Sequence, residues 1–127
     1  TYAVGFVTDE RQMASVYAAA DVFVLPSLED NLPNTIMESL ACGVPCVGFR
    51  VGGIPEMIDH RVNGYVANFK DVADLATGLQ WVLDEADARA LSAAARRKVE
   101  MRYSQSAVAA EYIEVYNEMI AQKTYRI

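Results

Sequence analysis

The sequence has few residues that could hold a metal ion or form disulfide bonds. It contains two cysteines, Cys42 and Cys46, and one histidine, His60. A cysteine- and histidine-rich zinc site needs about four such ligands, so this set is too small. Both cysteines lie in or beside apolar runs, which is typical of reduced, partly buried thiols in a reducing compartment. We therefore expect no metal site and no bound cofactor.

Positive charge and long apolar runs are scarce as well. Eleven Lys and Arg residues stand against seventeen Asp and Glu residues, and the formal net charge is -6. An acidic surface repels nucleic acid and anionic lipid, so neither is an expected partner. No apolar run approaches the roughly 20 residues that cross a bilayer, and the first residues do not resemble an export signal. We expect a soluble, cytoplasmic protein without a transmembrane segment.

The length of 127 residues and the 53% hydrophobic content fit a single domain over residues 1–127. Runs typical of strands alternate with runs typical of helices as far as residue 67. Strands are expected at 2–7, 21–25, 46–49 and 65–67, and helices at 9–20, 34–41 and 54–58. This alternation implies right-handed crossovers, and hence an α/β fold with a Rossmann-like, doubly wound parallel sheet.

From residue 71 onward the pattern is helical throughout. Apolar residues recur at helical spacing over 72–83 and again over 91–99. Ser104 has the character of an N-cap for a last helix, whose apolar stripe includes Tyr112 and Tyr116. The chain contains no internal repeat and no linker long enough to separate two domains.

The segment 26–38 is the strongest candidate for a binding site. It joins a strand-like run to a helix that begins near Asn34, and this order directs backbone N–H groups toward an anionic ligand. The N–H groups around Asn34, Thr35 and Ile36, together with roughly half a positive charge from the helix dipole, would suit a diphosphate. Glu38 follows one turn later on the same helical face, where its carboxylate can accept two hydrogen bonds from vicinal hydroxyls.

Together with residues 43–47 and 52–56, this segment resembles the donor-binding signature of family 4 glycosyltransferases, which have the two-domain GT-B fold. Members of that family usually show two acidic residues eight positions apart, an E-A-x-A-C-G-x-P-V-V run and a Gly-Gly turn. The run from Glu38 to Val47 follows this pattern closely, and Asp30 takes the place of the first acid, which is more often Glu. The resemblance extends from about Gly5 to Tyr116.

The resemblance implies an enzyme, a hexosyltransferase that moves a sugar from a nucleotide diphosphate sugar to an acceptor hydroxyl with retention and without an obligatory metal. It implies that Asp30 is a catalytic residue facing the transferred sugar and that Glu38 binds the ribose. The other implied donor-binding residues are Asn31, Leu32, Pro33, Asn34, Thr35, Ile36, Gly52 and Gly53. Residues 31–33 stand where many relatives have Gly-Phe-Gly, and Pro33 has no N–H to donate, so the donor stays open between UDP and GDP types.

Two of these residues have competing interpretations. The pair Gly52-Gly53 either lets a substrate approach the main chain or forms a tight turn between a strand and a helix. Glu38 either binds ribose or is a solvated acid near a helix start, which stabilises a helix by up to about 1 kcal/mol. His60 lies in a polar turn and is expected at the surface rather than as a catalytic base.

Compared with the family, the sequence resembles the later part of a C-terminal donor-binding domain. The N-terminal acceptor domain and an Arg-Lys pair that offsets leaving-group charge have no counterpart here. We therefore expect the isolated chain to lack turnover, its missing N-terminal domain to be a partner, and the complete enzyme to be cytoplasmic or peripheral to a membrane. The alternative is a non-enzymatic α/β assembly module that forms a homodimer through an exposed sheet edge. A flavodoxin-like receiver fits less well, because the acid cluster expected at its strand ends is absent.

Overall fold

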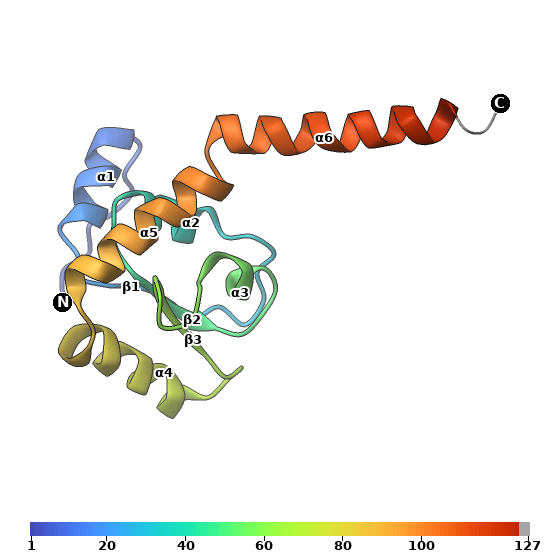
Figure 1. The fold of residues 1–127 in the computed structure, drawn as a ribbon. Helices are drawn as coiled ribbons and strands as arrows, with labels where there is room; N and C mark the ends of the chain where they lie inside the picture. Colours follow the sequence, from blue (N-terminus) through green and yellow to red (C-terminus); the bar gives the residue numbers. More distant parts are fainter. Residues whose placement is uncertain (125–127) are drawn as a thin grey trace.

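The structure, a computed structural model, describes residues 1–124 and is organised around a three-stranded parallel sheet (Figure 1). The strands are β1 (Phe23–Leu25), β2 (Cys46–Phe49) and β3 (Gly64–Ala67), and they lie in the order β1-β2-β3. In the register, Phe23 is opposite Cys46, which is in turn opposite Gly64. Because β2 is the central strand, all four of its residues are buried.

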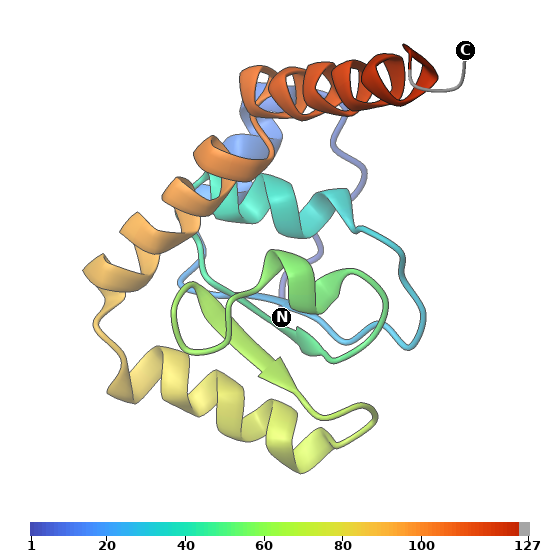
Figure 2. The same ribbon diagram turned by 45° about the vertical axis from the view of Figure 1, so that its right-hand side comes forward.

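Helices cover both faces of this sheet, as the sequence predicts. The described residues form α1 (Glu10–Ala18), α2 (Asn34–Ala41), α3 (Ile54–Met57), α4 (Val72–Gln80), α5 (Ala88–Arg102) and α6 (Gln105–Thr124), and α4 continues into the π-helical segment η1 (Trp81–Glu85). Helices α2 and α5 pack together over one face, with α1 beside α2, and α4 covers the other face (Figure 2). The doubly wound α/β architecture is therefore confirmed.

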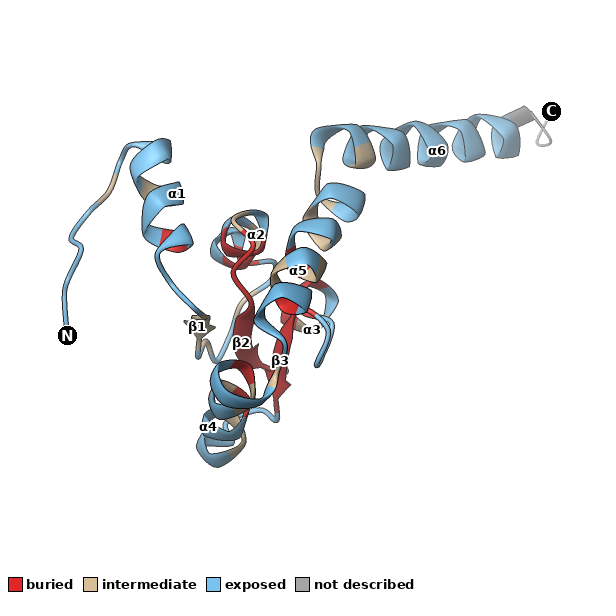
Figure 3. Ribbon diagram, turned by 60° about the vertical axis from the view of Figure 1, so that its left-hand side comes forward, coloured by how far each residue is buried: buried red, intermediate tan, exposed pale blue. Residues whose placement is uncertain are grey.

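The core consists of two layers on opposite faces of the sheet. Alternate residues of a strand point to opposite faces, so Cys46 packs with Ile36 and Leu40 of α2, whereas Val47 packs toward the α4 side with Val82. Burial is concentrated along β2, β3 and the inner sides of α2 and α5 (Figure 3). The apolar spacing over 91–99 identified the inner side of α5 correctly, since Leu91 and Ala95 are buried, whereas Val72 and Leu83 of the 72–83 run are exposed.

Residues 2–7 form no strand, which corrects the sequence-based expectation. Tyr2 and Phe6 are 98% and 95% exposed. A strand is stable only when its backbone groups pair with a neighbour, and no strand among the described residues pairs with this segment. The outer edge of β1 likewise has no partner strand within residues 1–124, and its three residues are half-buried.

The last helix, α6, projects away from the rest of the protein (Figure 1). Ser104 caps it as predicted, because its carbonyl accepts from the Val108 N–H at 3.0 Å and its Oγ from the Ala107 N–H at 3.2 Å. The large apolar side chains along α6 are exposed, including Tyr112 at 62% and Ile120 at 64%. No helix in residues 1–124 is both long enough and apolar enough to span a bilayer.

Candidate functional site

The first part of the candidate site is the start of α2, at the carboxyl end of β1. Helix α2 begins at Asn34, and its N-cap residue, Pro33, has no side chain that can accept a hydrogen bond. The Pro33 carbonyl accepts from the Ile36 N–H at 3.1 Å, while the N–H groups of Asn34 and Thr35 have no acceptor in the part of the chain that the structure describes. Ile36 is a core residue with a fully buried side chain. Of the three N–H groups that were predicted to bind a diphosphate, those of Asn34 and Thr35 are therefore available to a ligand at the start of α2.

The second part is the contact between the Gly-Gly turn and the loop before α2. The Gly53 N–H donates to the Asn31 carbonyl at 2.6 Å. Gly52 has a φ of 53°, which favours glycine, and a β-carbon there would overlap the Asp30 carbonyl oxygen. These glycines thus let the loop before α2 come into main-chain contact with the Gly-Gly turn, and this contact holds the loop in place. Contact of the same pair with a ligand stays a prediction.

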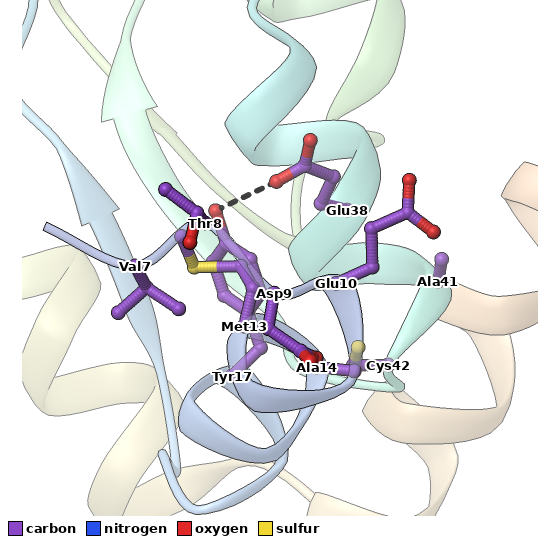
Figure 4. A pocket seen from close by; sticks show the side chains of 10 residues that line it. All are labelled: Val7, Thr8, Asp9, Glu10, Met13, Ala14, Tyr17, Glu38, Ala41 and Cys42. Carbon is purple, nitrogen blue, oxygen red and sulfur yellow. Dashed lines mark hydrogen bonds between the residues drawn. The ribbon is translucent and has the colours of Figure 1, made fainter.

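The third part is a cavity of about 460 Å³ next to Glu38 (Figure 4). Its wall comes from the segment before α1, from α1 itself and from the middle and end of α2. The lining residues are Val7, Thr8, Asp9, Glu10, Met13, Ala14, Tyr17, Glu38, Ala41 and Cys42. Glu38 therefore faces a cavity large enough for part of a nucleotide.

Glu38 is held by a hydrogen bond from the neighbouring helix. The hydroxyl of Tyr17 in α1 donates to Glu38 Oε2 at 3.1 Å (Figure 4). Burial of Tyr17, together with the bond to the Glu38 carboxylate and its charge, raises the pKa of the Tyr17 hydroxyl to about 12. The hydroxyl consequently stays protonated, and remains a donor, throughout the neutral range.

The cavity is acidic, which limits what it can bind. Asp9, Glu10 and Glu38 all contribute to its wall, and Asp9 Oδ1 also accepts the N–H groups of Arg11 and Gln12 at the start of α1. Carboxylates accept hydrogen bonds and repel anions, so this space suits hydroxyl and N–H groups rather than phosphate. Residues 1–124 contain no group of three His, Cys, Asp or Glu side chains placed to hold a metal ion.

The predicted residues thus fall into two neighbouring groups. Glu38 lines the cavity, whereas none of the residues 30–36, Gly52 or Gly53 does. Residues 30–32 contact the Gly-Gly pair. Glu38 lies about one helical turn after the start of α2, which follows directly on this loop. Sequence reasoning did not identify Tyr17 as a site residue. Its partner is visible only in three dimensions, because Tyr17 and Glu38 are 21 positions apart and belong to different helices.

Comparison with known proteins identifies the family of the chain. The family described as "Glycosyl transferases group 1" matches residues 1–85. The chain belongs to this family. Its match covers all three strands, the loop before α2, the Gly-Gly turn and every residue that lines the cavity.

Several glycosyltransferases are similar to this group 1 chain. The N-acetyl-alpha-D-glucosaminyl L-malate synthase of Bacillus anthracis is 31% identical over 116 residues, which is 91% of the chain and 30% of the synthase. Among solved structures, a sucrose-phosphate synthase from Thermosynechococcus elongatus is 28% identical with a TM-score of 0.75, over 91% of the chain and 29% of that synthase. Anabaena HepE in complex with UDP-glucose shares the fold, with a TM-score of 0.67 and 23% identity over 98% of the chain and 32% of HepE.

These similarities define both the fold and the extent of the match. The sheet and its flanking helices correspond to the α/β fold of GT-B glycosyltransferases. The chain spans about 30% of the length of the relatives that it matches. The family is described as one of glycosyl transferases, which makes the protein a member of a transferase family.

Proposed function

We propose that this chain is the donor-binding part, within residues 1–127, of a retaining glycosyltransferase of family 4. The observation that supports this proposal most directly is the position of Glu38. It faces a cavity one turn beyond a helix start, where the N–H groups of Asn34 and Thr35 have no acceptor within residues 1–124. A nucleotide diphosphate sugar has an anionic diphosphate between a hydroxyl-rich ribose and a hydroxyl-rich sugar. The N–H groups at the start of α2 are complementary to the diphosphate, and the Glu38 carboxylate is complementary to the ribose hydroxyls.

In the proposed complex, the N–H groups of Asn34 and Thr35 bind the diphosphate, which the positive end of the α2 dipole also stabilises. The Glu38 carboxylate accepts hydrogen bonds from the two ribose hydroxyls inside the acidic cavity. A hydroxyl pair carries no charge, so the negative wall does not repel it. Binding therefore places the ribose in the cavity and the phosphates outside it, at the start of α2.

The transferred sugar then lies beside the loop before α2, where Asp30 faces it as the catalytic residue and Asn31 and Leu32 contact its hydroxyls. The Gly-Gly turn supports this loop through the 2.6 Å bond from Gly53 to Asn31. Pro33 is buried and offers no N–H, so its contribution is limited to its contacts within the loop. Both UDP and GDP donors fit this description, and the UDP-glucose bound to HepE supports a UDP type.

Transfer itself is proposed for the whole protein, because the chain spans about 30% of its relatives. In that protein, an N-terminal domain binds the acceptor hydroxyl, and a hexosyl group moves to it with retention at the anomeric carbon and without an obligatory metal. We place this protein in the cytoplasm or at the surface of a membrane. The chain alone is expected to bind donor nucleotides weakly and to transfer nothing.

Titration of the ¹⁵N-labelled chain with UDP and GDP tests this proposal. We expect saturable shifts of the amide signals of residues 30–38, with the largest at Asn34 and Thr35. Replacing Glu38 with Ala removes two hydrogen bonds to a carboxylate and should weaken binding about tenfold to a hundredfold. Glu29→Ala is the matched control, because Glu29 is an exposed acid in the preceding loop and should leave binding unchanged. A complete lack of shifts in this segment would contradict the proposal.

A second candidate, an assembly module, is favoured by the exposed apolar side chains of α6 and by the unpartnered edge of β1 within residues 1–124. In this alternative, two copies associate through one of these surfaces to form a homodimer. Light scattering distinguishes the two candidates. A stable dimer that binds no nucleotide supports assembly, whereas a monomer that binds UDP or GDP supports donor binding.

A further inference from the structure

Tyr17 is held more firmly than the carboxylate that it contacts. Its side chain is 8% exposed, and its ring lies edge-on to the ring of Phe23 in β1, with a centroid distance of 5.6 Å and an interplanar angle of 74°. An aromatic side chain has only two rotatable bonds, and here packing against the sheet restricts both. The hydroxyl is therefore a donor at a defined point on the cavity wall.

Glu38, in contrast, is an exposed side chain with three rotatable bonds. Holding such a side chain in one rotamer costs conformational entropy. The bond from the Tyr17 hydroxyl to Oε2 at 3.1 Å fixes it before any ligand arrives. An ionised carboxylate has about four lone-pair sites, so one bond from Tyr17 leaves Oε1 and part of Oε2 available to two further donors.

We propose that Tyr17 is a positioning residue that holds the Glu38 carboxylate in the orientation that accepts the ribose hydroxyls of the donor nucleotide. This inference rests on the proposed function of Glu38 and adds a second helix, α1, to the donor site. A neutral hydroxyl suits the task better than a cation, because it orients the carboxylate without neutralising it. The high pKa of Tyr17, about 12, means that this donor does not titrate at neutral pH.

The first test needs no ligand. Three-bond couplings of Glu38 in the ¹³C- and ¹⁵N-labelled chain report whether its χ1 angle is single or averaged. We expect a single rotamer in the original chain and averaging in Tyr17→Phe, which keeps the ring against Phe23 and removes only the hydroxyl. Equal averaging in the two proteins would overturn the inference, whatever the chain binds.

The second test asks whether Tyr17 acts through Glu38. Tyr17→Phe should weaken UDP or GDP binding about threefold to tenfold, the effect of losing one hydrogen bond. The same substitution in a Glu38→Ala background should have no further effect, because the group that it positions is absent. Equal losses in both backgrounds would show that Tyr17 contributes independently of Glu38, and would overturn the inference.

Tyr65→Phe is the matched control for both tests. The Tyr65 hydroxyl donates to Asp74 Oδ1 at 2.7 Å, so this variant also loses a tyrosine-to-carboxylate bond, but outside the set of cavity-lining residues. It should leave the Glu38 couplings and nucleotide affinity unchanged. If the original chain binds nucleotide through Glu38 and Tyr17→Phe binds equally well, the inference fails and the proposed function stands. If the original chain binds neither UDP nor GDP, both fail.

Discussion

The α-carbon of Gly52 lies so close to the carbonyl oxygen of Asp30 that a β-carbon at position 52 would overlap this oxygen. A β-carbon on Gly53 would overlap the carbonyl oxygen of Asn31 in the same way. The Gly-Gly turn after β2 and the loop after β1 are therefore in main-chain contact. The position of the loop that precedes α2 depends on this contact.

Gly52→Ala should consequently destabilise the protein. The variant combines a positive φ, which costs an ordinary residue about 1–3 kcal/mol, with overlap against backbone atoms that cannot move independently. We expect the free energy of unfolding, measured by urea denaturation, to fall by at least about 2 kcal/mol. Gly5→Ala is a suitable control, because Gly5 also has a positive φ of 75°, but apart from its two chain neighbours no described residue lies within 4 Å of the position that a β-carbon would take there. Equal losses in the two variants would show that the loop contact contributes nothing.

The pH dependence of stability should report the environment of His60. Its Nδ1 accepts from the Val66 N–H at 3.1 Å, and its ring lies 4.4 Å from that of Tyr65. Desolvation, followed by the charges of Arg61 and Arg50, lowers the pKa of His60, and the charge of Asp74 only partly offsets this lowering. Protonation of Nδ1 would remove the acceptor of the Val66 N–H.

The sign of this effect follows from the lowered pKa. The unfolded chain binds a proton at His60 at higher pH than the folded chain does, so His60 contributes stability above about pH 6.5, the unperturbed value. That contribution is lost as the pH falls through the folded pKa. Urea midpoints of the original chain should therefore drop more between pH 7 and pH 5 than those of His60→Asn, whose side chain does not titrate. Parallel profiles of the two proteins would contradict this assignment.

The two cysteines should differ in reactivity. Cys46 is fully buried under α2, and burial raises the pKa of its thiol to about 12, whereas Cys42 is half-buried and lines the cavity. Because the thiolate is the reactive form, one thiol should react with iodoacetamide in the folded protein at pH 8 and two after unfolding. Mass spectrometry identifies the labelled residue. Labelling of Cys46 at the same rate as Cys42 in the folded state would show that the core opens readily.

Bound UDP or GDP should slow the labelling of Cys42, because the proposed ribose position lies in the cavity that Cys42 lines. The decrease in the labelling rate of Cys42 should be larger for the nucleotide that binds more tightly, and it should disappear in Glu38→Ala. Unchanged labelling of Cys42 at saturating nucleotide would place the ligand elsewhere on the protein.

Much of the fold was predictable because its signals are local. The start of α2 at Asn34 follows from the change from a polar loop to helical spacing, and its end before Gly43 follows from the positive φ of 77° that glycine adopts there. The strand at residues 46–49 was predictable from its short apolar run, since a central parallel strand is buried on both faces. Each of these elements depends on residues within a few positions of it.

The remaining features depend on contacts between distant residues. Residues 2–7 have the composition of a strand, but pairing decides whether a strand forms, and no described strand pairs with them. Tyr17 and Glu38 are 21 positions apart and belong to different helices, so their bond is set by how α1 packs on α2. The sequence likewise left open whether Gly52 and Gly53 serve a ligand or a turn, because the loop that meets them lies about 20 positions earlier in the chain.

The central claim, that Glu38 binds the ribose of a donor nucleotide, is tested most directly by comparing UDP with 2′,3′-dideoxy-UDP by calorimetry. Loss of the two hydroxyls should weaken binding to the original chain about tenfold or more, since two hydrogen bonds to a carboxylate are removed. The same loss should make little difference to Glu38→Ala, in which these bonds are already absent. An equal preference for UDP in both proteins, or no preference in either, would contradict the account.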